Sequence, residues 1–361
     1  MRKATVIAAA AICLLLVNEQ ARGQTTKPTY VEFDAPGAGT APGLGTFATA
    51  INTAGTITGD YLDASTVFHG FVRASSGTIT SFDAPGAGTG SYQGTVGNSI
   101  NTAGAVAGTY FDASQSHGFV RAAGGTITTF DAPGATSGQG TFAASINRAG
   151  AIAGYYYNAR NVIHGYVRSA GGHFAIFDAP GAGTGAGQGT EPSTINTAGV
   201  VAGWYEDAGG VFHGFVRAAT GVITTFDAPG AGTAAGQGTF ALSINTADVI
   251  AGTYSDAANI SHGYTRAASG VITSFDAPGA GTGAYQGTTA SSINAAGDVS
   301  GTLVAGFVNK AFLRASGGGI ITFQAPGSLN YTTATAINAA GDIAGFYLDA
   351  NSVDHGFLRT P

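Results

Sequence analysis

The sequence has almost no cysteine and few charged residues. Its one cysteine, Cys13, lies in an apolar run near the N-terminus. The rest of the chain can therefore form no disulfide and must be stabilised by packing and backbone hydrogen bonds. Charged residues make up 9% of the 361 residues, against roughly 25% in a typical soluble protein. Since 44% are hydrophobic, the composition still indicates a folded chain rather than a disordered one.

Positive charge and helical patterning are scarce as well. The chain has 14 Lys and Arg against 20 Asp and Glu, and phosphate binding needs a basic patch, so we expect no nucleic-acid partner. Beyond the N-terminal run, no stretch of about 12 residues carries apolar residues at helical spacing. Each of the 59 glycines would destabilise a helix by about 1 kcal/mol. Helical repeat architectures are therefore excluded.

The N-terminus has the pattern of an export signal. Two basic residues precede an apolar run at 4–17, and a small-x-small sequence follows at 21–23. We predict that residues 1–23 form a signal peptide and that the protein is secreted, either to the periplasm or outside the cell. No second long apolar run occurs, so we expect no membrane anchor. Residues 24–361 are then expected to form a single repeat domain.

A repeat of about 49 residues dominates the chain. The sequence FDAPG occurs six times, and a degenerate seventh copy begins at Phe323. An Ile-Asn pair also recurs seven times, with spacings of 49, 46, 49, 49, 49 and 44 residues. Its asparagines are Asn52, Asn101, Asn147, Asn196, Asn245, Asn294 and Asn338. So regular a period indicates a repeat architecture.

Each repeat contains four short segments rich in Thr, Val, Ile, Phe and Tyr, separated by turns with Gly, Asn or Pro. This predicts an all-β fold, a seven-bladed β-propeller of four-stranded antiparallel blades. Residues 30–37 read as a fourth strand and residues 355–361 as a third strand. We therefore expect the N-terminal strand to join the C-terminal blade and close the ring. A parallel β-helix, the alternative, offers no reason for this permuted start.

The repeat resembles a known family. The pattern I-N-x-x-G-x-[IV]-x-G-x-Y-x-D, followed by H-G-[FY]-x-R, is similar to the HAF repeats of bacterial secreted proteins. The resemblance covers nearly all of residues 30–361 and implies an extracellular repeat protein, with no catalytic residues to carry over. Gly stands where the family signature has Ala. Two repeats depart further, with Asp248 in place of a Gly and Lys310-Ala311-Phe312 in place of His-Gly-Phe.

One His and two Asp recur at fixed positions in five repeats, and the third repeat keeps the His and the second Asp with Asn158 in place of the first Asp. The second Asp follows the His by 14 residues, and the first ends the preceding strand, so all three are expected to meet at one end of a blade. The predicted members are Asp63, His69, Asp83, Asp112, His117, Asp131, His164, Asp178, Asp207, His213, Asp227, Asp256, His262, Asp276, Asp349, His355 and Asp34. The sixth repeat loses all three together. We interpret the group as a structural network without a metal or cofactor, calcium or zinc being the alternative.

The fourth repeat breaks the symmetry with Trp204, Glu191 and Glu206. Pairing its strands about a turn near Ala198 predicts that the two glutamates lie opposite each other, with Asp207 adjacent. Such carboxylates could act as the acid and nucleophile of a glycosidase, or as hydrogen-bond acceptors for a sugar that stacks on the indole.

The loops between repeats carry uncharged Tyr and Gln, namely Tyr92, Gln93, Tyr285 and Gln286. Such residues suit weak multivalent contacts with glycans or proteins. Our first hypothesis is a monomeric, non-catalytic recognition or scaffold module that binds an extracellular glycan or protein through these residues and through the fourth repeat. The alternatives are a polysaccharide-acting enzyme centred on the fourth repeat and a surface-structural protein without a ligand.

Overall fold

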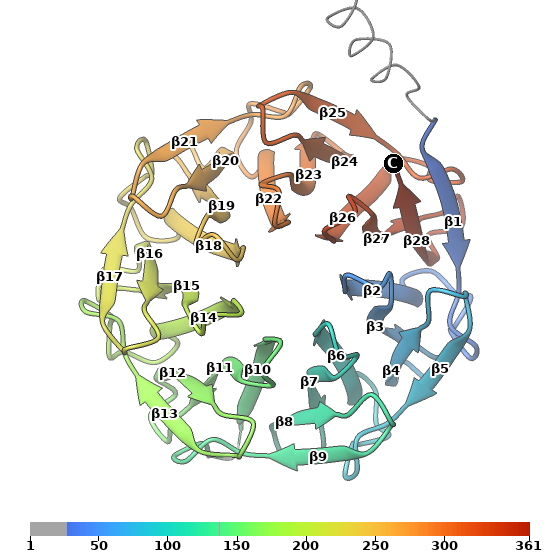
Figure 1. Cartoon of the computed structure of the whole chain (residues 1–361), viewed down its shortest axis with the longest axis horizontal. Coiled ribbons are helices and arrows are strands. Elements are labelled where there is room, and N and C mark those ends of the chain that lie inside the picture. The colour runs from blue at the N-terminus through green and yellow to red at the C-terminus, as the bar shows by residue number, and fades with distance from the viewer. Residues whose placement is uncertain (1–26, 137) are drawn as a thin grey trace, which may run out of the picture.

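The computed structural model describes residues 27–136 and 138–361, and these residues form 28 strands and no helix (Figure 1). The predicted all-β class is therefore confirmed. Accordingly, the described residues include no helix that is long and apolar enough to cross a membrane. The predicted signal peptide, residues 1–23, lies outside the described residues.

The strands follow the sequence repeat, and we number the seven groups of four as sets 1 to 7. Set 1 is β2 (Gly45–Ile51), β3 (Ile57–Leu62), β4 (Phe68–Arg73) and β5 (Ile79–Phe82). Set 2 is β6 (Gly94–Ile100), β7 (Val106–Phe111), β8 (Ser116–Arg121) and β9 (Ile127–Phe130). Set 3 is β10 (Thr141–Ile146), β11 (Ile152–Tyr157), β12 (Ile163–Arg168) and β13 (Phe174–Phe177). Set 4 is β14 (Gly189–Ile195), β15 (Val201–Glu206), β16 (Phe212–Arg217) and β17 (Ile223–Phe226).

The remaining sets have the same order. Set 5 is β18 (Gly238–Ile244), β19 (Ile250–Ser255), β20 (Ser261–Arg266) and β21 (Ile272–Phe275). Set 6 is β22 (Gly287–Ile293), β23 (Val299–Ala305), β24 (Val308–Arg314) and β25 (Ile320–Phe323). Set 7 is β26 (Tyr331–Ile337), β27 (Ile343–Leu348), β28 (Asp354–Thr360) and the N-terminal β1 (Thr29–Phe33).

Within a set, neighbouring strands pair antiparallel, as β14 with β15, β15 with β16 and β16 with β17. A single parallel pair then links the third strand of one set to the first strand of the next, such as Ile163 with Gly189. Because this link recurs at every junction, hydrogen bonds join all 28 strands into one sheet.

The junction explains one glycine of each repeat. Gly189 has a φ of +134°, and a Cβ there would meet the carbonyl oxygen of Ile163 far inside van der Waals contact. Only glycine tolerates both the backbone angle and the close approach. Set 7 departs from this pattern, since Tyr331 takes the glycine position and pairs with Asn309.

The two ends of the described chain meet. β1 pairs antiparallel with β28, from Thr29 opposite Thr360 to Phe33 opposite Gly356. In Figure 1 the blue β1 accordingly lies beside the red β28. The predicted pairing of the N-terminal strand with the last strands of the chain is thus confirmed, and it covers a strand edge that would otherwise be exposed.

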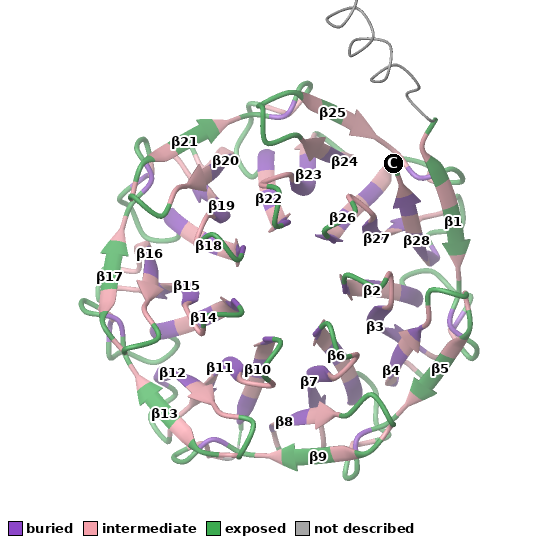
Figure 2. Ribbon diagram, viewed as in Figure 1, coloured by how far each residue is buried: buried purple, intermediate pink, exposed green. Residues whose placement is uncertain are grey.

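The first strand of each set lies nearest a central opening, and the fourth strand lies at the outer rim (Figure 1). The core is distributed between neighbouring sets instead of forming one centre. Ala153 of set 3, for example, packs with Val201, Tyr205 and Phe215 of set 4, and equivalent clusters occur at other junctions. Buried residues accordingly gather on the inner strands, while the rim is exposed (Figure 2).

An arginine at the end of each third strand also joins two sets. The guanidinium carbon of Arg217 lies 4.8 Å from the ring centroid of Phe177 in the preceding set, a cation–π contact. The equivalent arginines Arg73, Arg121, Arg168, Arg266, Arg314 and Arg359 lie 4.5–5.0 Å from their phenylalanines. These arginines therefore hold neighbouring sets together.

Candidate functional site

The structure brings the repeated His and Asp side chains together in all six repeats that carry them. His117 Nδ1 lies 2.8 Å from Asp131 Oδ1, and its Nε2 lies 3.3 Å from Asp112 Oδ2. In the other five repeats the Nδ1–carboxylate distance is 2.8–3.0 Å. Where the first Asp is present, His Nε2 lies 3.5–3.7 Å from it. The predicted juxtaposition is confirmed.

Set 3 shows how the protons are arranged. Asn158 replaces the first Asp, and its Oδ1 accepts the backbone N–H groups of Arg160 and Val162. Its Nδ2 therefore donates to His164 Nε2, at 2.9 Å. Because Nε2 accepts a hydrogen bond, Nδ1 carries the proton and donates a hydrogen bond to Asp178.

The first Asp of each network also folds a turn. Asp207 Oδ1 accepts the backbone N–H groups of Val211 and Gly209, and these bonds hold the pKa of Asp207 below its usual range. The histidine ring stacks on a tyrosine of the neighbouring strand, with Tyr205 and His213 at 5.0 Å between centroids. Across residues 27–136 and 138–361 no group of three or more His, Cys, Asp or Glu is arranged to hold a metal ion. The turn hydrogen bonds and the ring stacking tie neighbouring strands together, as a structural network would.

The predicted pairing of the two glutamates in set 4 is wrong. Glu191 lies opposite Trp204, and Glu206 lies opposite Gly189. The register shifts at a β-bulge between Pro192 and Thr194, which adds an unpaired residue to β14. The two glutamates stay on one face of the sheet but are diagonal neighbours.

Trp204 is half-buried in an aromatic cluster. Its ring packs edge-on against Phe212 at 5.2 Å and against Phe240 of set 5 at 5.5 Å. Glu191 is half-buried as well, and burial, with a further contribution from the charge of Glu206, raises its pKa to about 8. The indole therefore packs between two sets, and the carboxyl of Glu191 is protonated at neutral pH.

A pocket of about 260 Å³ opens between sets 2 and 3, on the face that carries the His–Asp networks. We call it the 2/3 pocket. Three aromatic side chains and several polar ones line it. They are Tyr92, Phe111 and Phe142, with Gln93, Asp112, Ser114, Gln115, Ser116 and Gln139.

Loop length explains why the pocket lies here. Asp112 and His117 are five residues apart, whereas the corresponding separation in set 1, from Asp63 to His69, is six. The loop before set 3 is two residues shorter than its counterpart before set 4. Together these deletions account for the short 46-residue spacing between Asn101 and Asn147. The short spacing was visible in the sequence, but only the three-dimensional arrangement links it to this pocket.

Tyr92 is held at the pocket in an unfavourable backbone conformation. Its φ is 58°, in the left-handed region, and the same position in other loops is occupied by Gly43, Gly187 and Gly236. A tyrosine there costs about 1 kcal/mol relative to glycine. The side chain is nonetheless 65% exposed. Its ring centroid lies 6.3 Å from that of Phe68, so the ring packs partly within the fold, and its exposed part borders the pocket.

The pocket combines an aromatic wall with an ionised acceptor. Phe111 and Phe142 have ring centroids 6.3 Å apart and come from different sets. Asp112 Oδ1 accepts hydrogen bonds from the backbone of Ser114 and Gln115, which hold the pKa of Asp112 well below its usual range. The carboxylate is therefore charged at any physiological pH.

The other predicted loop residues have different environments. Tyr285 is 82% exposed with a φ of 63°, and it does not line the 2/3 pocket. Gln93 Oε1 accepts the backbone N–H of Gly90, so this amide helps to fold its own loop. Gln286 lies against Gly281 in the same kind of loop. Of the four predicted loop residues, Tyr92 and Gln93 border the 2/3 pocket.

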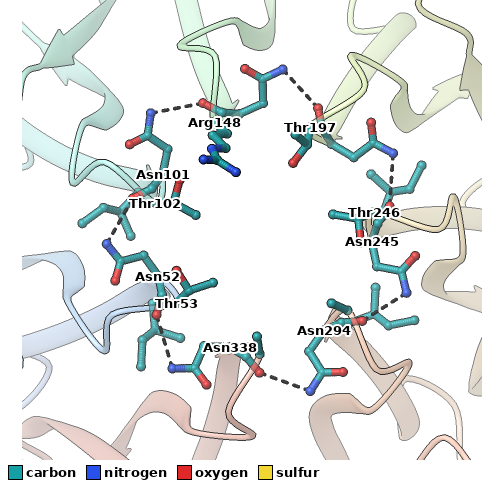
Figure 3. Close-up of a pocket in the computed structure, with 18 of the residues that line it drawn as sticks. Asn52, Thr53, Asn101, Thr102, Arg148, Thr197, Asn245, Thr246, Asn294 and Asn338 are labelled. Carbon is teal, nitrogen blue, oxygen red and sulfur yellow. Dashed lines mark hydrogen bonds between the residues drawn. The ribbon is translucent and has the colours of Figure 1, made fainter.

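A second cavity, which sequence reasoning missed, lies at the central opening (Figure 3). The side-chain amide of each repeat asparagine donates to the backbone carbonyl of the next one, at 3.0–3.2 Å, and the seventh donates to the first. The Ile-Asn pair served in the sequence only to count repeats. Its asparagines in fact form a closed ring of seven hydrogen bonds.

No protein-family model and no curated protein matches the chain. Solved structures do. A catalytically inactive virginiamycin B lyase from Staphylococcus aureus, solved with quinupristin, is 16% identical with a TM-score of 0.61, over 93% of this chain and 100% of that chain. A streptogramin B lyase is 13% identical with a TM-score of 0.58, over 92% and 98%. A prolyl endopeptidase is 9% identical with a TM-score of 0.54, over 96% of this chain and 52% of that chain. These neighbours are β-propeller proteins, and at such identities the likeness shows that this chain has the β-propeller fold.

Proposed function

We propose that this protein is a secreted recognition module of the HAF-repeat type, a seven-bladed propeller in which each set is one blade, and that it binds a saccharide in the 2/3 pocket. The binding is non-catalytic. The aromatic rings supply flat apolar surfaces on which a sugar ring stacks, and Asp112 and the glutamine amides supply hydrogen-bond partners for its hydroxyls.

The observation that carries the proposal is the position of Tyr92, an exposed aromatic residue at the rim of the 2/3 pocket. Glycine would fill its position without strain, yet a tyrosine stands there, exposed beside a pocket. Strained residues that persist at a surface are typical of binding sites. Tyr285 has the same backbone conformation but does not line the 2/3 pocket, so the pocket is what distinguishes Tyr92.

A glycan-array screen with a matched pair of variants tests the proposal. Tyr92→Gly removes the aromatic ring and introduces the residue that other loops carry, so the fold should be kept. Tyr285→Gly makes the same change outside the 2/3 pocket and serves as the control. We expect Tyr92→Gly to weaken glycan binding at least tenfold and Tyr285→Gly to leave it unchanged, with and without calcium. No binding by the wild type to any glycan would instead favour a protein partner or a structural role.

A second candidate function is polysaccharide cleavage in set 4. One observation favours it: the pKa of Glu191 is raised to about 8, while that of Asp207 is lowered. Acid–base catalysis requires one protonated acid and one ionised carboxylate. The double variant Glu191→Gln, Glu206→Gln tests it, because full activity of this variant on any polysaccharide that the wild type cleaves would exclude the site.

A further inference from the structure

The asparagine ring surrounds a cavity of about 240 Å³ at the end of the central opening, opposite the 2/3 pocket along β7. This volume corresponds to roughly eight water molecules at about 30 Å³ each, which is enough for a molecule the size of a monosaccharide. Each asparagine is buried, and its Oδ1 accepts two backbone N–H groups of the following turn, as Asn101 does from Ala103 and Ala105. The wall of the cavity is therefore preformed.

One charged side chain lines this cavity. The residue after the asparagine is Thr or Ala in six repeats but Arg148 in set 3. Figure 3 shows its guanidinium pointing into the opening. Seven of the other described arginines stack on phenylalanines. Arg148 instead is exposed and has no hydrogen-bond or ion-pair partner within residues 27–136 and 138–361. All five of its N–H donors are free to bind a ligand.

The neighbouring charges restrict the kind of ligand. Asp248, Asp298 and Asp342 accept hydrogen bonds from the amides of asparagines in the ring, at 2.6, 3.2 and 2.9 Å. These carboxylates do not line the cavity, but their combined charge opposes a multiply charged anion. A single carboxylate matches the planar fork of one guanidinium and adds only one negative charge.

We infer that the cavity inside the asparagine ring binds a small monocarboxylic acid, whose carboxylate pairs with Arg148 and whose remaining polar groups face the threonine hydroxyls around the opening. The hydroxyls are those of Thr53, Thr102, Thr197 and Thr246. This site does not depend on the 2/3 pocket, because the two lie at opposite ends of the strands.

Titration calorimetry with D-glucuronate, on the protein of residues 24–361, tests the inference. Arg148→Thr introduces the residue that four other repeats carry and should keep the fold. We expect it to weaken glucuronate binding at least tenfold. The control Arg160→Thr removes an equal charge from an exposed loop at the other end of β11, and it should leave binding unchanged. D-glucose, which lacks the carboxylate, should not bind at this site, and inorganic phosphate should bind more weakly than glucuronate.

Several results would overturn the inference. One is the absence of any heat of binding for glucuronate at millimolar concentration. The others are equal glucuronate affinity in the wild type and Arg148→Thr, an equal loss of affinity in Arg160→Thr and Arg148→Thr, and tighter binding of phosphate than of glucuronate. The Tyr92→Gly variant distinguishes glucuronate binding at this site from glucuronate binding in the 2/3 pocket. If glucuronate binding were lost in Tyr92→Gly and kept in Arg148→Thr, the acid would occupy the 2/3 pocket, and the proposed function would stand without this second site.

Discussion

The side-chain amide of Asn338 donates a hydrogen bond to the backbone carbonyl of Asn52, 286 residues earlier in the chain, at 3.2 Å. This bond completes the ring in which each repeat binds the next through the same pair of groups. The closure is cooperative in a simple geometric sense, because all seven of these amide–carbonyl bonds can form only when all seven repeats are in place.

Asn101→Ala should destabilise the protein by about 3 kcal/mol. The substitution removes three hydrogen bonds of about 1 kcal/mol each, one donated to Asn147 and two accepted from the following turn. Asn101→Asp keeps both accepted bonds but places a buried carboxylate oxygen against the carbonyl oxygen of Asn147, so it should destabilise the protein as well. Urea unfolding measures the two free energies. Equal stability of Asn101→Ala and the wild type would contradict a stabilising role for the ring.

Two neighbouring glycines should respond differently to alanine. At Gly189, a Cβ would overlap the carbonyl of Ile163, so Gly189→Ala should cost roughly 3 kcal/mol or more. At Gly187 the space is open and only the φ of +82° opposes a side chain, so Gly187→Ala should cost about 1 kcal/mol. Thermal unfolding of both variants provides the comparison. Similar losses would mean that the close approach between sets does not limit this position.

Asp60 should make stability depend on pH. It is buried with 5% of its surface exposed, and burial raises its pKa to about 8. The folded state then binds a proton more tightly than the unfolded state, so this group lowers the free energy of unfolding as pH rises from about 4 to about 8. Asp60→Thr introduces the residue found at the equivalent Thr109 and should raise stability at pH 8 by a few kcal/mol. A stability difference that did not change between pH 5 and pH 8 would contradict the raised pKa.

Deleting residues 24–36 should lower the melting temperature by roughly 10 °C or more. The deletion removes β1, and with it the Phe33 ring beneath Arg73 and the Asp34 carboxylate that binds His355. It also exposes the edge of β28. Differential scanning calorimetry checks the effect, with wild-type melting as the result that would refute closure by β1.

Repetition made the fold predictable from the sequence. Seven copies of one period fixed the strand number, and the permuted start at Phe33 predicted the pairing of β1 with β28. The 14-residue separation of His69 and Asp83 likewise placed them opposite each other across one hairpin. Each inference needed only a local pattern.

The candidate site was less predictable, because it depends on departures from the pattern. A bulge in β14 shifted the register at Glu191. Because all repeats share this bulge, comparing one repeat with another does not reveal it. The 2/3 pocket arises from three missing residues in two loops that meet only in the folded ring. Arg148 lies near other repeats only when the ring closes, so its neighbours could not be identified along the chain.

The most direct test of the proposed function restores one of the three missing loop residues. The turn at 112–116 is replaced by the longer turn at 63–68, and binding of the best glycan from the array is then measured by calorimetry. We predict that the grafted protein keeps the melting temperature of the wild type and loses binding at least tenfold, because the added residue fills the 2/3 pocket. Unchanged affinity in the grafted protein would contradict the assignment of the 2/3 pocket as the binding site.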